Sequence, residues 1–257
     1  MEFITEITED VGNGVTDPIR GYIGDKKIVA KYVYNNEGFI SLFNELLGYN
    51  LAQFFGIRFP YFGYAFFSEG ETKVKNGKKY IHESIFTYTI WLDKALPITS
   101  PNMTKFIQEN EIVNLFFFDI FIYNRDRNAG NLVIELPAKL YPIDYTHILP
   151  GGCIWTDEMK NNEYTIEGIV IDMFSSGYYQ YLIENRKISI SVIDECGSIF
   201  IEKIKKLKVE EIIMKIPSQL INKLSKEQIN LLIEYFNYMS ENFYIAIKLI
   251  KERIGKE

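Results

Sequence analysis

The stretch that most constrains this chain runs over residues 119–144. It reads DIFIYNRDRNAGNLVIELPAKLYPID, an aromatic run followed by a polar loop at 124–131 and then by two β-like segments. If the two segments pair as a hairpin, the second returns the chain to the loop. The hairpin would therefore bring Asp126, Asn131 and Asp144 together around one point.

These three side chains suit phosphoryl transfer. A kinase needs one carboxylate to orient the attacking hydroxyl and accept its proton, and a carbonyl oxygen with a second carboxylate to hold magnesium on the nucleotide phosphates. The spacing Asp-x-x-x-x-Asn of Asp126 and Asn131 matches the kinase catalytic loop. Asp126, Asn131 and Asp144 can supply the three groups.

A turn-rich segment near the N-terminus, residues 11–18, is a candidate phosphate-binding loop. Gly12 and Gly14 would let backbone N–H groups approach phosphate oxygens, and Thr16 would add a hydroxyl. A turn with two glycines is more often only a turn. Taken alone, this loop is therefore a weak signal.

Lys31 lies in an apolar strand, where its ammonium must find an anion or reach solvent. The next segment, residues 37–55, has the apolar spacing of a helix and contains Glu45. A kinase pairs a strand lysine with a glutamate on the following helix, so that the lysine reaches the phosphates. The alternatives are an outward-facing strand lysine and an ordinary solvated helix glutamate. Gly56 is expected to end the helix.

Composition limits the partners. The 257 residues allow one large domain or two lobes that share a cleft, and the net charge of −6 disfavours a broad basic surface for nucleic acid. Cys153 and Cys196 lie far apart without metal-like spacing, so neither zinc nor a disulfide is expected, which suits the cytoplasm. The acidic N-terminus lacks a signal-peptide pattern, and the apolar run 115–123 is too short to span a bilayer. We expect a soluble protein that binds neither nucleic acid nor membrane.

Lys31, Glu45, the 124–131 loop and Asp144, in this order, resemble the HipA-like serine/threonine kinases. The segment Gly12-Asn13-Gly14-Val15-Thr16-Asp17-Pro18 is similar to the glycine loop of that family's compact branch, and residues 44–49, NELLGY, are similar to its helix motif. The resemblance covers roughly residues 10–150.

The resemblance implies an α+β, bilobed, protein-kinase-like fold. Residues 1–92 would form a small nucleotide-binding lobe, an antiparallel sheet with one helix, and residues 93–257 a larger, mainly helical catalytic lobe. It implies ATP and Mg²⁺ as cofactors and transfer of the γ-phosphate to a protein hydroxyl. An antitoxin protein is a candidate partner beside the protein substrate.

The resemblance also implies a role for each site residue. Asp126 would be the catalytic base, Lys31 a phosphate ligand and Glu45 its partner. Asn131 and Asp144 would bind the metal. Gly12, Asn13, Gly14 and Thr16 would hold the nucleotide.

The chain departs from ordinary protein kinases in two places. Asn124 stands before Arg125 where they have histidine, and Tyr145 follows Asp144 where they have Phe-Gly. Regulation by activation-loop phosphorylation is therefore not expected, whereas phosphorylation of Thr16 in the glycine loop is a hypothesis.

Two other functions stay open on the sequence. One is a pseudokinase or nucleotide-binding regulatory module, although every catalytic group is present. The other is a lipid or small-molecule kinase; for lipids, a basic or apolar loop would be needed after Asp144, and residues 145–162 offer little of either.

Overall fold

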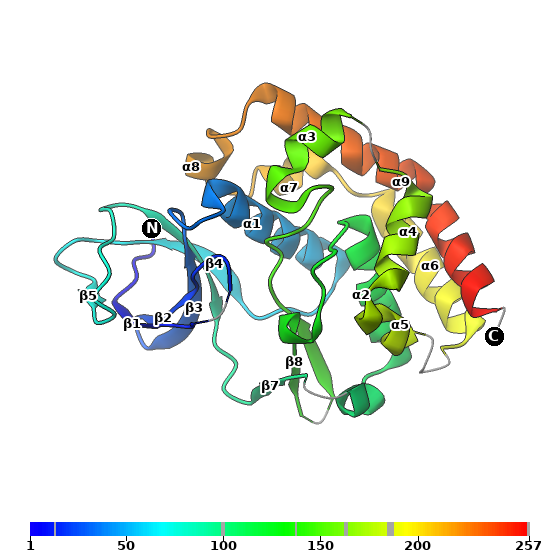
Figure 1. Cartoon of the computed structure of the whole chain (residues 1–257), viewed down its shortest axis with the longest axis horizontal. Coiled ribbons are helices and arrows are strands. Elements are labelled where there is room, and N and C mark those ends of the chain that lie inside the picture. The colour runs from blue at the N-terminus through cyan, green and yellow to red at the C-terminus, as the bar shows by residue number, and fades with distance from the viewer. Residues whose placement is uncertain (13, 99–100, 137, 162–163, 184–187, 256–257) are drawn as a thin grey trace.

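The computed structural model describes residues 1–12, 14–98, 101–136, 138–161, 164–183 and 188–255. It has two lobes, a small one built on a curled sheet and a large, mainly helical one (Figure 1). The sheet has the strand order β4-β6-β3-β2-β1-β5 and is antiparallel except where β5 pairs with β1. Its strands are β1 (Glu6–Asp10), β2 (Ile19–Ile23), β3 (Lys26–Tyr32), β4 (Phe62–Phe66), β5 (Lys73–Val74) and β6 (Ile85–Ile90).

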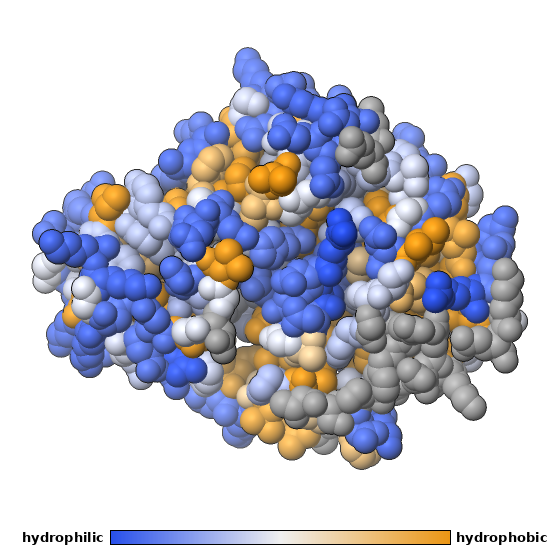
Figure 2. Space-filling view, viewed as in Figure 1, coloured by the Kyte–Doolittle hydropathy of each residue, from blue (hydrophilic) through white to orange (hydrophobic). Residues whose placement is uncertain are grey.

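One face of this sheet closes over an apolar cluster of its own. Alternation along β3 places Ile28 and Ala30 in that cluster with Ile7, Ile19 and Phe86. Hydrophilic residues cover most of the small lobe on the face shown in Figure 2. The small lobe therefore has an interior separate from the main core.

Helix α1 (Gly38–Phe55) lies between the sheet and the large lobe (Figure 1). Its apolar side chains, such as Leu42 and Phe43, belong to the same core cluster as helix α2 of the large lobe. The helix ends at Gly56, which has a φ of 67° and donates its N–H to Ala52 and Gln53. The predicted stop at Gly56 is confirmed.

The chain leaves the six-stranded sheet after Ile90 and enters a second sheet at Ala95. This sheet has the order β7-β8-β9, and its strands are β7 (Ala95–Pro97), β8 (Leu132–Glu135) and β9 (Lys139–Pro142). The predicted boundary at residue 92 lies in the connecting stretch, and the division into two domains there stays a prediction. The β8–β9 pair is the hairpin expected after the polar loop.

Helix α2 (Glu109–Phe121) is the centre of the large lobe, where α6 and α9 pack against it. Aromatic side chains such as Phe116, Phe117 and Phe121 are fully buried on it. Burying each contributes roughly 1.5–3 kcal/mol. The other helices are α3 (Trp155–Lys160), α4 (Ile166–Ser175), α5 (Gly177–Ile183), α6 (Ile190–Ile204), α7 (Val209–Ile213), α8 (Ser218–Ile221) and α9 (Lys226–Ile254).

The longest helix, α9, begins at a capping box whose pattern, Ser225 with Gln228 three residues later, is visible in the sequence. The Ser225 hydroxyl accepts from the Gln228 N–H, and the Gln228 side chain accepts from the Ser225 N–H. Within the described ranges, no helix combines the length and the apolar character that crossing a bilayer requires.

Candidate active site

Lys31 on β3 is the centre of a buried polar cluster between the lobes. Its Nζ lies 2.9 Å from Glu45 Oε2, 2.8 Å from Asp144 Oδ1 and 2.7 Å from Thr146 Oγ1. Glu45 Oε2 also accepts from the Tyr145 N–H at 2.9 Å. One lysine therefore ties a strand and the helix after it to a segment more than a hundred residues away.

The cluster favours the charged forms of Lys31 and Asp144. Burial opposes the charge of Lys31, but the Asp144 and Glu45 carboxylates outweigh it and raise the Lys31 pKa above its usual value. Burial likewise opposes the charge of Asp144, yet Lys31 and the Thr146 N–H keep the pKa of that carboxyl well below its usual range. Burial raises the Glu45 pKa, and Lys31 limits the rise. An ammonium is thus fixed beside an ionised aspartate.

One face of α1 positions the segment that carries Asp144. Asn44 donates to the Thr146 carbonyl at 2.8 Å and to the Gly152 carbonyl at 3.2 Å. Gly48 touches Tyr145 so closely that a Cβ at residue 48 would lie 2.3 Å from the Tyr145 Cβ. Asp144 itself has a φ of 61°, a left-handed conformation that aspartate tolerates better than most residues. The NELLGY segment thus aligns Asp144 as well as supplying Glu45.

Arg127 fixes the polar loop from beneath. Its guanidinium is fully buried and pairs with Asp119 of α2 at 2.8 and 3.1 Å. It also donates to the carbonyls of Asn131 and Ile143, at 2.9 and 2.7 Å. The buried Asp119 carboxylate thus has its cation, and Arg127 also joins the two ends of the β8–β9 hairpin.

Asp126 stands at the mouth of this loop with 46% of its side chain exposed. The Asn131 amide donates to the Asp126 Oδ2 at 3.0 Å and to its backbone carbonyl at 2.8 Å. His147 Nδ1 lies 3.6 Å from the same Oδ2. An oriented, accessible carboxylate of this kind can accept a proton from an approaching hydroxyl.

The oxygens next to Lys31 suit a magnesium ion. The hairpin places Asn131 beside Ile143, whose N–H donates to the Asn131 carbonyl at 3.0 Å. Asp144 is the next residue after Ile143, so the hairpin brings Asp144 close to Asn131. The Asn131 amide nitrogen faces Asp126, so the Asn131 Oδ1 points away from Asp126. Amide and carboxylate oxygens are hard ligands, and Mg²⁺ prefers such ligands in proteins. Asn131 and Asp144 therefore fit the metal role expected of them.

The glycine loop joins β1 to β2 and is closed by the Val11 N–H, which donates to the Pro18 carbonyl at 2.8 Å. Gly12 and Gly14 have φ values of 80° and 114°, a region that other residues avoid. Thr16 is only 5% exposed and lines a cavity of about 300 Å³ with Tyr32 and Tyr80. Its hydroxyl is thus covered in this conformation. Asn13, also expected here, lies outside the described residues.

Several residues at the site were not predicted from sequence. Thr146 contacts Lys31, and His147 contacts Asp126; both follow Asp144 closely, which is the one signal that could have found them. Thr87 on β6 pairs with Lys31 across the sheet, and its buried hydroxyl has no hydrogen-bond partner among the residues that the structure describes. Nothing in the local sequence marks Thr87.

The comparisons with known proteins bear on this site. A family model described as HipA-like kinase matches residues 4–145, a range that contains Lys31, Glu45, Asp144 and the whole polar loop. The chain belongs to the HipA-like kinases. This membership confirms the resemblance and supports phosphotransferase activity.

A solved structure gives independent support for the fold. The proinflammatory kinase CtkA of Helicobacter pylori is similar over 99% of this chain and 97% of that chain, with a TM-score of 0.60 and 13% identity. At this identity the likeness concerns the fold, and it confirms the predicted bilobed, kinase-like α+β architecture of this HipA-like kinase. No curated protein matches the chain.

Proposed function

We propose that this chain is an ATP- and magnesium-dependent serine/threonine protein kinase. The observation that carries the proposal is the buried Lys31 ammonium shared by Glu45 and Asp144, with Asp126 and Asn131 on the polar loop that precedes the hairpin. This is a phosphate-binding cation next to hard metal ligands and an accessible base.

Each residue has a task in this proposal. Lys31 would offer its charge to the nucleotide phosphates, and Glu45 would keep the lysine oriented. Asn131 and Asp144 would hold the metal ion. Asp126 orients the substrate hydroxyl and accepts its proton, while Asn131 holds Asp126 through its amide. When bound, Mg²⁺–ATP supplies the phosphoryl group and the cation that offsets its charge.

Labelled ATP with magnesium tests the proposal on the wild type, Asp126→Ala and Asp144→Asn. Removing one positioned electrostatic group typically lowers a rate by about 10²–10³, so both variants should transfer almost no label. His82→Gln is a matched control, because His82 is an exposed residue of the small lobe. Equal labelling of all four proteins would refute the site assignment.

The same assay separates the alternatives. A thermal shift with ATP and magnesium but no transfer would favour a pseudokinase. Label in extracted lipids or small molecules, with none in protein, would favour the other kinase class. Phosphoserine or phosphothreonine in labelled protein, identified by mass spectrometry of a treated lysate, is the result that we expect.

A toxin role held in check by an antitoxin belongs to the same proposal and rests on the family resemblance alone. Induced expression should then arrest growth in the wild type and not in Asp126→Ala. The cytoplasm is the expected place, because ATP is available there and Cys153 and Cys196 are free thiols. Unimpaired growth at a verified level of active kinase would contradict the toxin role.

A further inference from the structure

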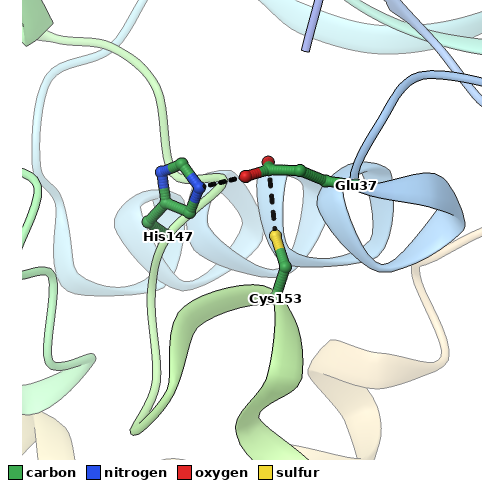
Figure 3. A group of neighbouring side chains, drawn as sticks. All are labelled: Glu37, His147 and Cys153. Atoms are coloured by element: carbon green, nitrogen blue, oxygen red, sulfur yellow. Dashed lines mark hydrogen bonds and ion pairs between the residues drawn. The ribbon is translucent and has the colours of Figure 1, made fainter. Parts of the chain in front are cut away.

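Three side chains that the proposed reaction does not use gather in one place (Figure 3), and one of them, His147, contacts Asp126. Glu37 precedes α1, His147 follows the Asp144 segment, and Cys153 lies on the short turn Gly152–Ile154. One donor atom from each lies within 4.8 Å of the other two. His147 Nε2 is 2.6 Å from Glu37 Oε1, and Cys153 Sγ is 3.4 Å from Glu37 Oε2.

We propose that Glu37, His147 and Cys153 form a binding site for Zn²⁺. Carboxylate oxygen, imidazole nitrogen and thiolate sulfur are the ligands that zinc takes in proteins, and three of them leave a fourth position for water. No sequence pattern indicates this site, because the three residues come from distant segments. The expectation that zinc plays no part here was drawn from the cysteine spacing and from the presence of only two histidines, His82 and His147.

The spacing of the donors suits a tetrahedral ion. Zinc–ligand bonds of the usual lengths hold neighbouring donor atoms roughly 3.3–3.6 Å apart. Cys153 Sγ is 3.4 Å from Glu37 Oε2, whereas His147 Nε2 contacts the other carboxylate oxygen, Oε1, so the Glu37 carboxylate would rotate to bring one oxygen to the ion. The shorter contact from Glu37 to His147 is a hydrogen bond, and it lengthens when the ion replaces the shared proton.

The contact of the second ring nitrogen of His147, Nδ1, supports the zinc site. A histidine that binds a metal usually donates its other ring N–H to a carboxylate, which fixes the ring. Here Nε2 faces Glu37, while Nδ1 faces Asp126 Oδ2 at 3.6 Å. The outer carboxylate of this zinc site would thus be Asp126 itself.

Zinc at Nε2 would keep a proton on Nδ1, directed at Asp126. The zinc-free imidazolium also carries this proton, but bound zinc would hold the ring in place, and an aspartate held by a fixed donor is a weaker proton acceptor, so zinc should slow phosphoryl transfer. This consequence rests on the proposed kinase function, whereas zinc binding does not.

The ion can reach the site and must compete with protons there. The His147 and Glu37 side chains are 34% and 16% exposed. Hydrogen bonds to Asp126, Cys153 and Glu37 raise the His147 pKa to about 11 against the effect of burial, and burial raises the pKa of the Cys153 thiol. Zinc binding should therefore release protons and tighten as pH rises.

Cobalt titration of the full chain tests the site directly, because Co²⁺ bound to a thiolate gives a charge-transfer absorption that oxygen ligands at a magnesium site do not give. We expect this absorption in the wild type and its loss in Cys153→Ser. Added Zn²⁺ should displace the cobalt. His147→Gln should weaken Zn²⁺ binding at least roughly 100-fold, since even an outer partner of a metal site is worth 10–100-fold.

The chain supplies matched controls in its other cysteine and its other histidine. Cys196→Ser in α6 and His82→Gln should keep both the cobalt absorption and the wild-type zinc affinity. A folded wild type without the absorption, or an absorption that persists in Cys153→Ser, would overturn the zinc site. Thermal melts followed by circular dichroism identify any variant that has failed to fold. Glu37→Gln then takes the place of that variant in the titration, and we expect it to bind Zn²⁺ more weakly than the wild type.

Kinase assays with added Zn²⁺ complete the test. Inhibition should occur in the wild type and Cys196→Ser and be relieved in Cys153→Ser. Equal inhibition of all three would overturn the regulatory role. A chain that binds cobalt through Cys153 but never transfers phosphate would refute the proposed function and leave the zinc site standing.

Discussion

Gly48 provides a sharp test of how α1 positions Asp144. A Cβ at this residue would lie 2.3 Å from Tyr145 Cβ and 2.5 Å from Tyr145 Cγ. Carbon atoms in good contact are about 3.5–4.0 Å apart, so Gly48→Ala must push Tyr145 away by roughly 1 Å or more. Asp144 precedes Tyr145, and the Tyr145 N–H is bound to Glu45, so both carboxylates should shift.

Two effects on stability oppose each other in Gly48→Ala. Alanine in a helix interior is worth about 1 kcal/mol over glycine, whereas overpacking of a core contact costs about 1–3 kcal/mol. We expect a net loss of about 0–2 kcal/mol in urea unfolding. Activity should fall much further, by roughly 10²-fold, because a displacement of about 1 Å is costly at a reacting centre.

Gly197→Ala is the matched control, since the nearest atoms to a Cβ at this glycine of α6 belong to the Ile247 side chain, at 3.0 to 3.4 Å. Ile247 of α9 lies outside the Lys31 cluster, so phosphate transfer should be unchanged. If Gly48→Ala proved more stable than the wild type and fully active, the role given to the α1 contact would be wrong.

Three further predictions use the same unfolding measurements. Arg127→Met leaves Asp119 buried without its cation and should lower the free energy of unfolding by about 3–5 kcal/mol. Adding Asp119→Leu should restore part of this loss. If it restores none, the broken ion pair is not the cause. Asp144 has a depressed pKa, so it contributes stability that is complete above about pH 4 and is lost as pH falls further. In Lys31→Met the free energy of unfolding should fall less steeply below about pH 4, because Lys31 no longer lowers the Asp144 pKa. The same fall as in the wild type would contradict this interaction between Lys31 and Asp144. Ser225→Ala should cost about 1 kcal/mol by removing the cap of α9, and a change within error would show that the cap is not needed.

Local signals in the sequence were enough for several elements. The glycine stop of α1, the capping box of α9 and the hairpin after the polar loop each depend on a few neighbouring residues. The Asp126–Asn131 spacing is equally local, and the two side chains are joined by a hydrogen bond. Strand β1, which lies in the acidic N-terminus, was not expected from the sequence.

Other features depended on the packing of distant segments. The sequence by itself determined which residue types the chain brings to a phosphate and a metal, because order and spacing are written along the chain. Tertiary structure alone decided that Lys31 meets Asp144, that Gly48 packs on Tyr145 and that Glu37 joins a histidine and a cysteine beside Asp126. These contacts form only when α1 is buried against the large lobe, and that burial sums many apolar contacts that no short motif records.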